Sequence, residues 1–272
     1  MPHHFVHPAR SVSLALPQSP DHPRPLRVLS VHRRALNLLD DAGNIIAVVT
    51  PEVGDGPFHI VLTHSLAFDF AAPGQDGFWQ GTSLTLADHR IEWARARFWN
   101  PGLTPVFISQ PALAALRDCM QEASAFQNRW KGIDKRTMLR IQSGVESIVR
   151  GLKDGERETL RRGVSRLIGL GPGLTPAGDD VLLGMLARLW LDAAQPAATE
   201  LGQCVRDAAA MTTRISRAWL QHAVRGQFDA RWHALQAALL IADDTAICDT
   251  AHRILSVGAS SGPQAMAGFL LT

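Results

Sequence analysis

The sequence GLGPGLTPAGDD at residues 169–180 concentrates glycines, prolines and two adjacent aspartates in one turn. Gly169, Gly171 and Gly173 allow positive φ angles, or the close approach of a ligand to the backbone. The segment that follows, VLLGMLARLW at 181–190, is apolar and predicts a core helix. A plain connector does not need so many special residues, so this stretch is the first candidate for a functional site.

The start of this helix predicts an anion-binding site. Thr175 followed by Pro176 is typical of an N-cap and a first helical residue. The first amides of a helix have no partner inside the helix, and the helix dipole attracts anions to this end. We therefore expect Gly171, Gly173, Thr175 and Gly178 to bind substrate. The alternative is a tight connection between helices that binds nothing.

The two acids of the motif are candidate catalytic residues. Asp179 and Asp180 are neighbours on the expected helix, so their side chains point about 100° apart. One is expected to stabilise the helix dipole, and the other to face a ligand, a metal ion or a basic side chain. The motif lacks the Gly-Lys-Ser/Thr ending of a phosphate loop and follows no predicted strand. Neither a Walker site nor a dinucleotide fingerprint is therefore predicted.

A basic helical segment, TTRISR, begins at Thr212 and forms a second candidate motif. Arg214 and Arg217 lie one helical turn apart, so both guanidinium groups are candidates for binding one anion. Thr213 and Ser216 are included as substrate-binding hydroxyls, and Ser216 shares a face with Thr212. The alternative interpretation is an amphipathic helix with a solvated basic edge.

A third small-residue loop, GASSGP at 258–263, precedes another expected helix. Ser260 and Ser261 are expected either to cap that helix or to hold a ligand beside the first glycine loop; close helix packing is the alternative. No Ser-His-Asp set and no nucleophile elbow can be assembled from the spacing. His222 is the best candidate for a general base among the single histidines of the helical stretches.

The two halves of the chain differ in their periodicity. Residues 26–108 carry short apolar runs separated by Gly- and Pro-containing turns, which predicts an antiparallel β-sheet or barrel without crossover helices. The expected strands are 27–31, 35–39, 45–50, 58–62, 83–86 and 91–99. Residues 109–272 repeat apolar positions every three or four residues, which predicts a mostly helical domain that carries the glycine motif. The fold class is therefore α+β. Residues 1–25, rich in proline and histidine, are expected to be a flexible segment.

Composition excludes several classes of function. The formal charge of +2 and the absence of long basic runs argue against nucleic acid as a partner. The three cysteines, Cys119, Cys204 and Cys248, show no paired spacing, so we expect reduced thiols, no disulfide and no metal site. No signal peptide is predicted. No membrane span is predicted either, because Arg188 and Asp192 interrupt the apolar helix. The expected location is the cytoplasm, and the sequence does not identify a cofactor.

Taken together, the motif at 169–180, Leu183-Gly184, Thr213-x-Ile215-Ser216 and Gly258-x-Ser260-Ser261-Gly262 resemble the AllH family. One member of that family is counted as a subunit of oxamate carbamoyltransferase in anaerobic allantoin breakdown, beside two other subunits. The resemblance covers most of the chain, and its first motif is long and specific. The family pattern often has His in place of Ala259 and an acid in place of Gln264.

The resemblance implies transfer of a carbamoyl group, in which phosphate attacks an oxalurate-like ureide and gives carbamoyl phosphate and oxamate. Such a reaction needs donors for phosphate and carboxylate, together with hydrogen bonds to the carbonyl oxygen as charge develops. The implied partners are a small anionic substrate and other protein subunits. The alternative of a different class is a non-catalytic scaffold or ligand-sensing subunit, in which the glycine loops only pack helices or dock another chain.

Overall fold

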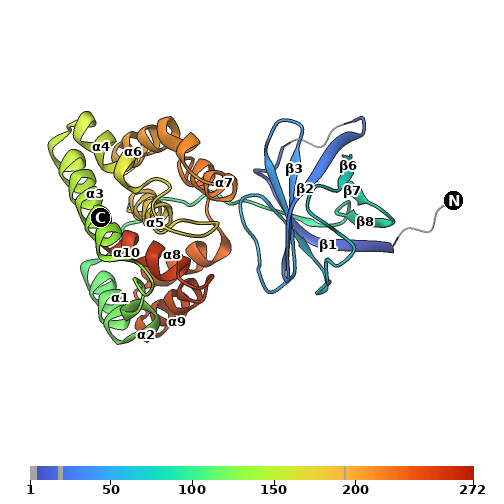
Figure 1. Ribbon diagram of the computed structural model, residues 1–272. Helices are drawn as coiled ribbons and strands as arrows, with labels where there is room; N and C mark the ends of the chain where they lie inside the picture. The colour runs from blue at the N-terminus through green and yellow to red at the C-terminus, as the bar shows by residue number, and fades with distance from the viewer. Residues whose placement is uncertain (1–4, 18–20, 193) are drawn as a thin grey trace. The chain divides into compact units, whose positions relative to one another are not determined.

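The computed structural model describes residues 5–17, 21–192 and 194–272. They form two compact units, which divide between Pro101 and Gly102. The first contains only strands and loops, and the second is helical (Figure 1). The prediction of a β-barrel followed by a helical region is confirmed.

The first unit is a barrel closed by eight strands. Its strands follow the order β5-β4-β3-β2-β6-β7-β8-β1, and a pairing between β1 and β5 closes the ring, with β9 added beside β1. The strands are β1 (Phe5–Ser13), β2 (Arg24–His32), β3 (Ala35–Asp40), β4 (Ile45–Val49), β5 (His59–Leu62), β6 (Asp76–Gln80), β7 (Ser83–Leu86), β8 (His89–Glu92) and β9 (Arg97–Trp99). Alternate residues of these strands fill the interior with aliphatic side chains, which is how a small barrel makes its core.

The sequence did not predict the strand that closes the barrel. Phe5–Ser13, expected to be flexible, is strand β1, and it pairs antiparallel with β5 and parallel with β8 and β9. The strand is held by backbone hydrogen bonds on both sides, and its side chains, His7 and Pro8 among them, do not reveal this pairing. With a parallel pair between β4 and β5 as well, the sheet is mixed rather than wholly antiparallel. The rest of the prediction for residues 1–4 and 18–20 lies outside the described residues.

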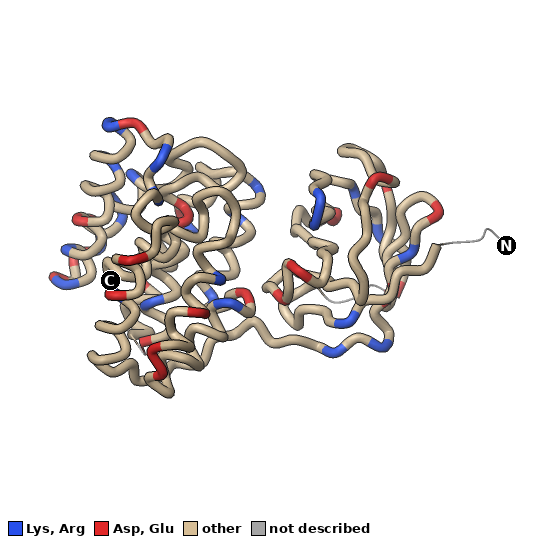
Figure 2. Tube along the Cα trace, turned by 90° about the horizontal axis from the view of Figure 1, so that it is seen from below, with Lys and Arg blue, Asp and Glu red and all other residues tan. Residues whose placement is uncertain are grey.

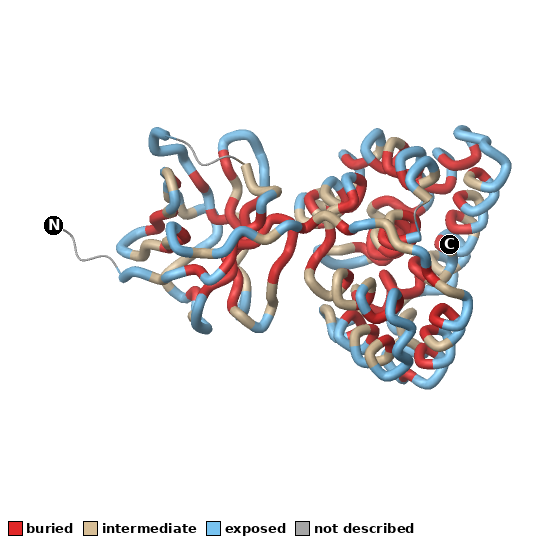
Figure 3. The backbone as a smooth tube through the Cα atoms, turned by 180° about the vertical axis from the view of Figure 1, so that it is seen from behind, coloured by how far each residue is buried: buried red, intermediate tan, exposed pale blue. Residues whose placement is uncertain are grey.

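The second unit packs its helices around a buried central helix, α5 (Figure 1). Its elements are α1 (Gln110–Glu122), α2 (Ser124–Gln127), α3 (Lys135–Asp154), α4 (Arg157–Leu167), α5 (Ala177–Leu191), α6 (Gln195–Ala208), η1 (Ala209–Met211), α7 (Arg214–Ala223), α8 (Ala230–Ile241), α9 (Asp244–Leu255) and α10 (Ser261–Leu270). Thirteen of the fifteen residues of α5 are buried, and the core of this unit is visible as buried backbone in Figure 3. The apolar segment after the glycine motif is therefore a core helix, as predicted.

Helices α5 and α10 approach so closely that only glycine fits at two crossing positions. A Cβ atom on Gly184 would lie 1.8 Å from the carbonyl oxygen of Ala265, and one on Gly268 would lie 2.1 Å from that of Val181. Both distances are far below any van der Waals contact. The close crossing fixes the start of α10 beside the start of α5, where the candidate site lies.

Charged residues of both signs are interspersed over each unit (Figure 2). In the part of the chain that the structure describes, no helix combines the length and the apolar character that crossing a membrane would require.

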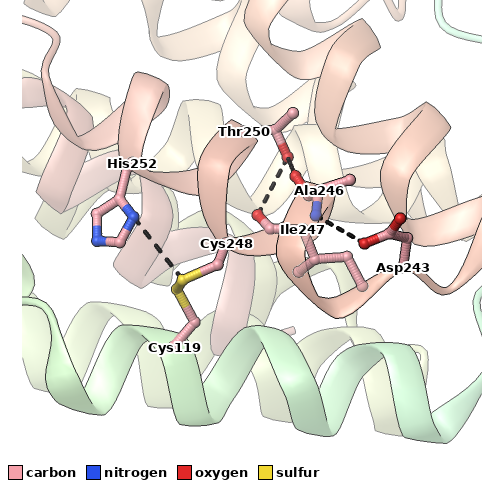
Figure 4. The surroundings of a disulfide bond; sticks show 7 residues. All are labelled: Cys119, Asp243, Ala246, Ile247, Cys248, Thr250 and His252. Carbon is pink, nitrogen blue, oxygen red and sulfur yellow. Dashed lines mark hydrogen bonds between the residues drawn. A yellow bond between two sulfur atoms is a disulfide. The ribbon is translucent and has the colours of Figure 1, made fainter.

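The expectation of three reduced thiols is wrong for two of the cysteines. Cys119 of α1 and Cys248 of α9 form a disulfide (Figure 4), whereas Cys204 is a buried free thiol. The two half-cystines are 129 residues apart in the sequence, and the packing of α1 against α9 brings their Cα atoms to 5.7 Å. The spacing of the cysteines along the chain does not predict such a long-range pair.

Candidate functional site

The glycine motif forms an irregular loop between α4 and α5. Gly169, Gly171 and Gly173 have φ angles of +68°, +115° and +98°, so of the two expected uses of these glycines, positive φ is observed at all three. A Cβ atom on Gly169 would lie 2.4 Å from the carbonyl oxygen of Met211, so this glycine also serves close packing. A Cβ atom on Gly173 would meet nothing within 4 Å. Gly173 therefore lies at the exposed tip of the loop, where its positive φ and not a lack of space favours glycine.

Helix α5 begins one residue later than predicted. Its N-cap is Pro176, which has no side-chain capping group, and its first residue is Ala177. The carbonyl oxygen of Pro176 accepts the amides of Asp179 and Asp180. Thr175 was expected to be the N-cap; instead its hydroxyl is hydrogen-bonded to that of Ser261 on α10, at 2.7 Å. The threonine thus connects the first loop to the third candidate motif.

Asp179 organises the site from the inside. Its Oδ1 accepts the amide of Gly169 at 2.8 Å, and its Oδ2 accepts the hydroxyls of Thr212 and Ser216, the latter at 2.7 Å. Burial raises the pKa of Asp179 above its ordinary value, and the hydrogen bonds from Thr212, Gly169 and Ser216 oppose that rise. With all these donors directed at it from inside the protein, Asp179 holds the glycine loop against the start of α7.

A second contact attaches the same loop to α7. Thr213 is the N-cap of α7, where its hydroxyl oxygen accepts the amide of Ser216 at 3.1 Å. The same hydroxyl donates to the carbonyl oxygen of Leu174 at the loop tip, at 2.5 Å. The structure therefore brings the first and second motifs together, and their threonine and serine hydroxyls serve the loop geometry.

Replacing Ser216 by alanine is expected to destabilise the helical unit by about 1.5–3 kcal/mol, because a buried carboxyl loses one of its donors. Chemical denaturation of the full chain measures the change. Ser165→Ala on α4 is the matched control, since that hydroxyl is exposed and, among the described residues, bonds to the carbonyl of Arg161 alone; its effect should stay within about 0.5 kcal/mol. Equal effects for the two variants would contradict the organising role of Asp179.

Asp180 is the least satisfied group of the site. Asp180 is only 7% exposed, and its Oδ2 has no hydrogen-bond partner among the described residues. Burial raises the pKa of Asp180 well above its ordinary value; the nearby charge of Asp179 adds to the rise, and the hydroxyls of Ser261 and Thr175 oppose it. This environment favours the protonated carboxylic acid, which can donate a hydrogen bond, over the carboxylate. A buried polar atom without a partner costs stability, so its retention is typical of a functional site.

The backbone beside Asp180 offers unused donors. Within the described residues no hydrogen bond uses the amides of Gly171, Gly173, Leu174, Thr175 or Ala177. Gly178, predicted to be part of the anion site, has a different task. Its amide donates to the carbonyl oxygen of Leu170 at 2.9 Å, and a Cβ atom on it would lie 2.0 Å from that of Leu167. Among the described residues of the motif, the amides without a hydrogen bond are therefore those of the loop and of the first residue of α5.

The two arginines of the second motif differ in their surroundings. Arg217 donates through Nε to the carbonyl oxygen of Ala209 and through Nη2 to those of Ala210 and Thr212. It thus binds the carbonyl groups in and just after η1. Arg214, the first residue of α7, is exposed. Of the two, Arg214 is therefore the more exposed to solvent.

The remaining predicted residues separate into near and distant ones. Ser261 lies in the site through its bond to Thr175, and Ser260 is the N-cap position of α10 without a side-chain capping bond. His222 lies near the opposite end of α7 from Ser216, about 9 Å further along the helix axis. Its Nδ1 is hydrogen-bonded to Oε1 of Gln227 at 2.6 Å, and burial lowers its pKa. The structure therefore does not group His222 with the two aspartates.

Thr212 was noted in the sequence only as a neighbour of Ser216, yet its hydroxyl donates directly to Asp179. Gln264, where the family pattern has an acid, is buried and donates to the carbonyl oxygen of Arg129 at 3.1 Å. The four-residue spacing of Thr212 and Ser216 was a usable signal for a shared partner. Nothing in the sequence pointed from Gln264 to a loop 135 residues earlier.

This arrangement defines a helical domain whose glycine loop and helix N-termini surround a buried, incompletely bonded carboxyl. The family described as oxamate carbamoyltransferase subunit AllH matches residues 167–272, and the AllH family N-terminal domain matches residues 12–99. The two matches together cover more than two thirds of the chain, and the chain belongs to the AllH family. No solved structure matches it.

Proposed function

We propose that this chain contributes the anion- and carbamoyl-binding site of an oxamate carbamoyltransferase-type assembly. The family description, a carbamoyltransferase subunit, supports the reaction class and the presence of other subunits. The observation that carries the proposal is the buried carboxyl of Asp180, whose Oδ2 has no partner, beside the unused amides of the glycine loop.

The proposed reaction belongs to the breakdown of allantoin-derived ureides. A phosphate oxygen attacks the carbamoyl carbon of an oxalurate-like substrate, the carbon–nitrogen bond breaks, and the nitrogen leaves with a proton as part of oxamate. Negative charge develops on the carbamoyl oxygen during the attack, so donors directed at that oxygen lower the barrier.

The loop residues supply the donors that this reaction needs. The amides from Gly171 to Ala177, at the positive end of α5, bind the phosphate or the carboxylate. Asp180, in its neutral form, donates a hydrogen bond to an oxygen of the bound substrate. The exposed Arg214 adds a positive charge at the solvent side of the site. Thr175 and Ser261 set the position of the Asp180 carboxyl, and Asp179 holds the loop in place.

Inorganic phosphate, carbamoyl phosphate, oxamate and oxalurate are the ligands for the test. Titration of the isotope-labelled chain should shift the backbone amide signals of Gly171, Gly173 and Ala177, and calorimetry should give a matching affinity. Asp134→Ala is the control variant, because it removes an acid remote from the glycine loop, the N-cap of α3. It should show the same shifts and the same affinity as the native chain. Shifts spread evenly over the surface, or none at all, would overturn the proposal.

Replacing Gly173 by alanine is expected to weaken anion binding at least about tenfold, because the loop tip must leave its φ of +98° to relieve strain of about 1–2 kcal/mol. Gly155→Ala is the matched control. Gly155 has a φ of +68° at the end of α3, and a Cβ atom there also meets nothing within 4 Å. It should lose similar stability and keep full affinity for the anion. Equal affinities of the two variants would exclude the loop tip from the site.

The alternative function, a non-catalytic scaffold, is favoured by the packing tasks of Gly169 and Gly178 and by the internal bonds of Asp179. Under this alternative no tested anion shifts the loop amides. Substitution of Asp180 would then leave turnover of the complete assembly unchanged.

A further inference from the structure

Outside the glycine site, one cluster gathers soft donor atoms from two helices. Cys119 near the end of α1 and Cys248 and His252 of α9 place one donor atom each within 4.8 Å of one another. It is the one group of at least three such side chains that lies close enough for metal binding among the described residues. Figure 4 shows the imidazole of His252 turned toward the sulfur of Cys248.

The arrangement of α9 accounts for two of the donors. Cys248 and His252 are four residues apart, so they project from the same face of the helix. This spacing is the one by which two histidines on a helix bind zinc. The third donor, Cys119, comes from α1, which packs against α9 across the disulfide.

One distance already suits a metal ion. The Sγ of Cys248 and the Nδ1 of His252 are 3.8 Å apart. In a tetrahedral zinc site with bonds of about 2.3 Å to sulfur and about 2.0 Å to nitrogen, two such ligands lie about 3.5 Å apart. A disulfide alone does not need an imidazole at this position. Because His252 is exposed, a cation has access to the cluster from solvent.

We propose that the reduced form of this cluster binds a zinc ion through the thiolates of Cys119 and Cys248 and the imidazole of His252. Reduction must come first: a trialkylphosphine and water convert the disulfide to two thiols, the phosphine becomes the phosphine oxide, and the protons go to sulfur. Binding of Zn²⁺ then releases both thiol protons. Three protein ligands leave one tetrahedral position for water or another small ligand. The metal replaces the disulfide as the link between α1 and α9.

Cobalt(II) is the spectroscopic probe for this site. The full chain is reduced with the phosphine, desalted without oxygen, shown by thiol titration to have three free thiols, and titrated with Co²⁺. We expect one Co²⁺ per chain, with sulfur-to-metal charge-transfer bands and the intense visible bands of tetrahedral cobalt, and complete bleaching by Zn²⁺. Cys119→Ser combined with Cys248→Ser should abolish the bands. His252→Ala should lower affinity at least about tenfold, since even an outer-shell partner contributes that much.

Cys204→Ser is the matched control, because Cys204 is a buried free thiol elsewhere in the same unit and its loss should leave the bands unchanged. A disulfide that resists the phosphine in the folded chain would overturn the proposal, and so would a reduced chain that shows no bands. Unchanged affinity in His252→Ala would remove the imidazole from the site and overturn the three-ligand arrangement.

Discussion

Replacing Gly184 by alanine is expected to destabilise the helical unit by about 3 kcal/mol, as overpacking of a close contact does. The added Cβ atom would lie 1.8 Å from the carbonyl oxygen of Ala265 and 2.8 Å from the amide nitrogen of Phe269. Both neighbours are backbone atoms of α10, so no side-chain rotation relieves the clash. The gain from helix propensity, about 1 kcal/mol for Gly→Ala, is too small to offset it.

Chemical denaturation of Gly184→Ala measures the change, with Gly202→Ala as the matched control. Gly202 is also inside a helix, α6, and the nearest atom to its added Cβ would be the Cβ of Val224 at 3.2 Å. At this distance the neighbour must move by only a few tenths of an ångström, and the gain in helix propensity offsets that cost and leaves Gly202→Ala near neutral. If both variants unfolded at the same denaturant concentration, the close crossing of α5 and α10 would be incorrect.

The crossing matters for function because it positions the third motif. Helix α10 begins at Ser261, whose hydroxyl contacts Thr175 of the glycine loop. A separation of α5 and α10 at Gly184 therefore moves Ser261 away from Thr175 and Asp180. We expect Gly184→Ala to weaken anion binding along with stability, even though Gly184 lies two helical turns from the loop.

Much of the helical unit could be predicted because its periodicity is local. The spacing of Leu113, Leu116 and Met120 predicts the buried face of α1, and all three are buried in the structure. The glycines of the motif likewise allowed positive φ angles to be predicted, because the local residue type is enough for this prediction. The starting point of α5 was predicted one residue too early, because a Thr-Pro pair fits both an N-cap and a loop that ends at the proline.

The parts that could not be predicted depend on contacts between distant segments. Strand β1 is defined by backbone pairing with β5 and β8, and the disulfide by the packing of α1 on α9. The different tasks of Asp179 and Asp180 also arise in this way. Helix geometry predicts that adjacent acids diverge, but which of them meets Thr212 and Ser216 depends on where α7 lies.

Asp180 is expected to cost stability as pH rises, and the sign follows from its protonation. Its pKa is raised well above the ordinary 3.8, so the folded chain holds a proton that the unfolded chain releases. Stability from this group is therefore greatest below pH 3.8 and falls as pH rises through the folded pKa. Asp180→Asn removes the titrating group, so it should flatten this decline and be more stable than the native chain at alkaline pH. A parallel pH profile of the two proteins would contradict a neutral, buried Asp180.

The same residue gives the largest expected effect on activity. With oxalurate and phosphate as substrates and the companion subunits present, Asp180→Ala should lower turnover by about 10²–10³, the usual cost of losing one donor to a developing oxyanion. Asp180→Asn keeps a donor in a side chain of nearly the same shape, so it should retain substrate binding within about tenfold and lose less turnover than alanine does. An ionised Asp180 acting as a base would lose as much with asparagine as with alanine. The ratio of the turnover rates of the two variants therefore distinguishes a neutral hydrogen-bond donor from a general base. If Asp180→Asn is more stable but less active than the native chain, that combination is the one expected of a group retained for function.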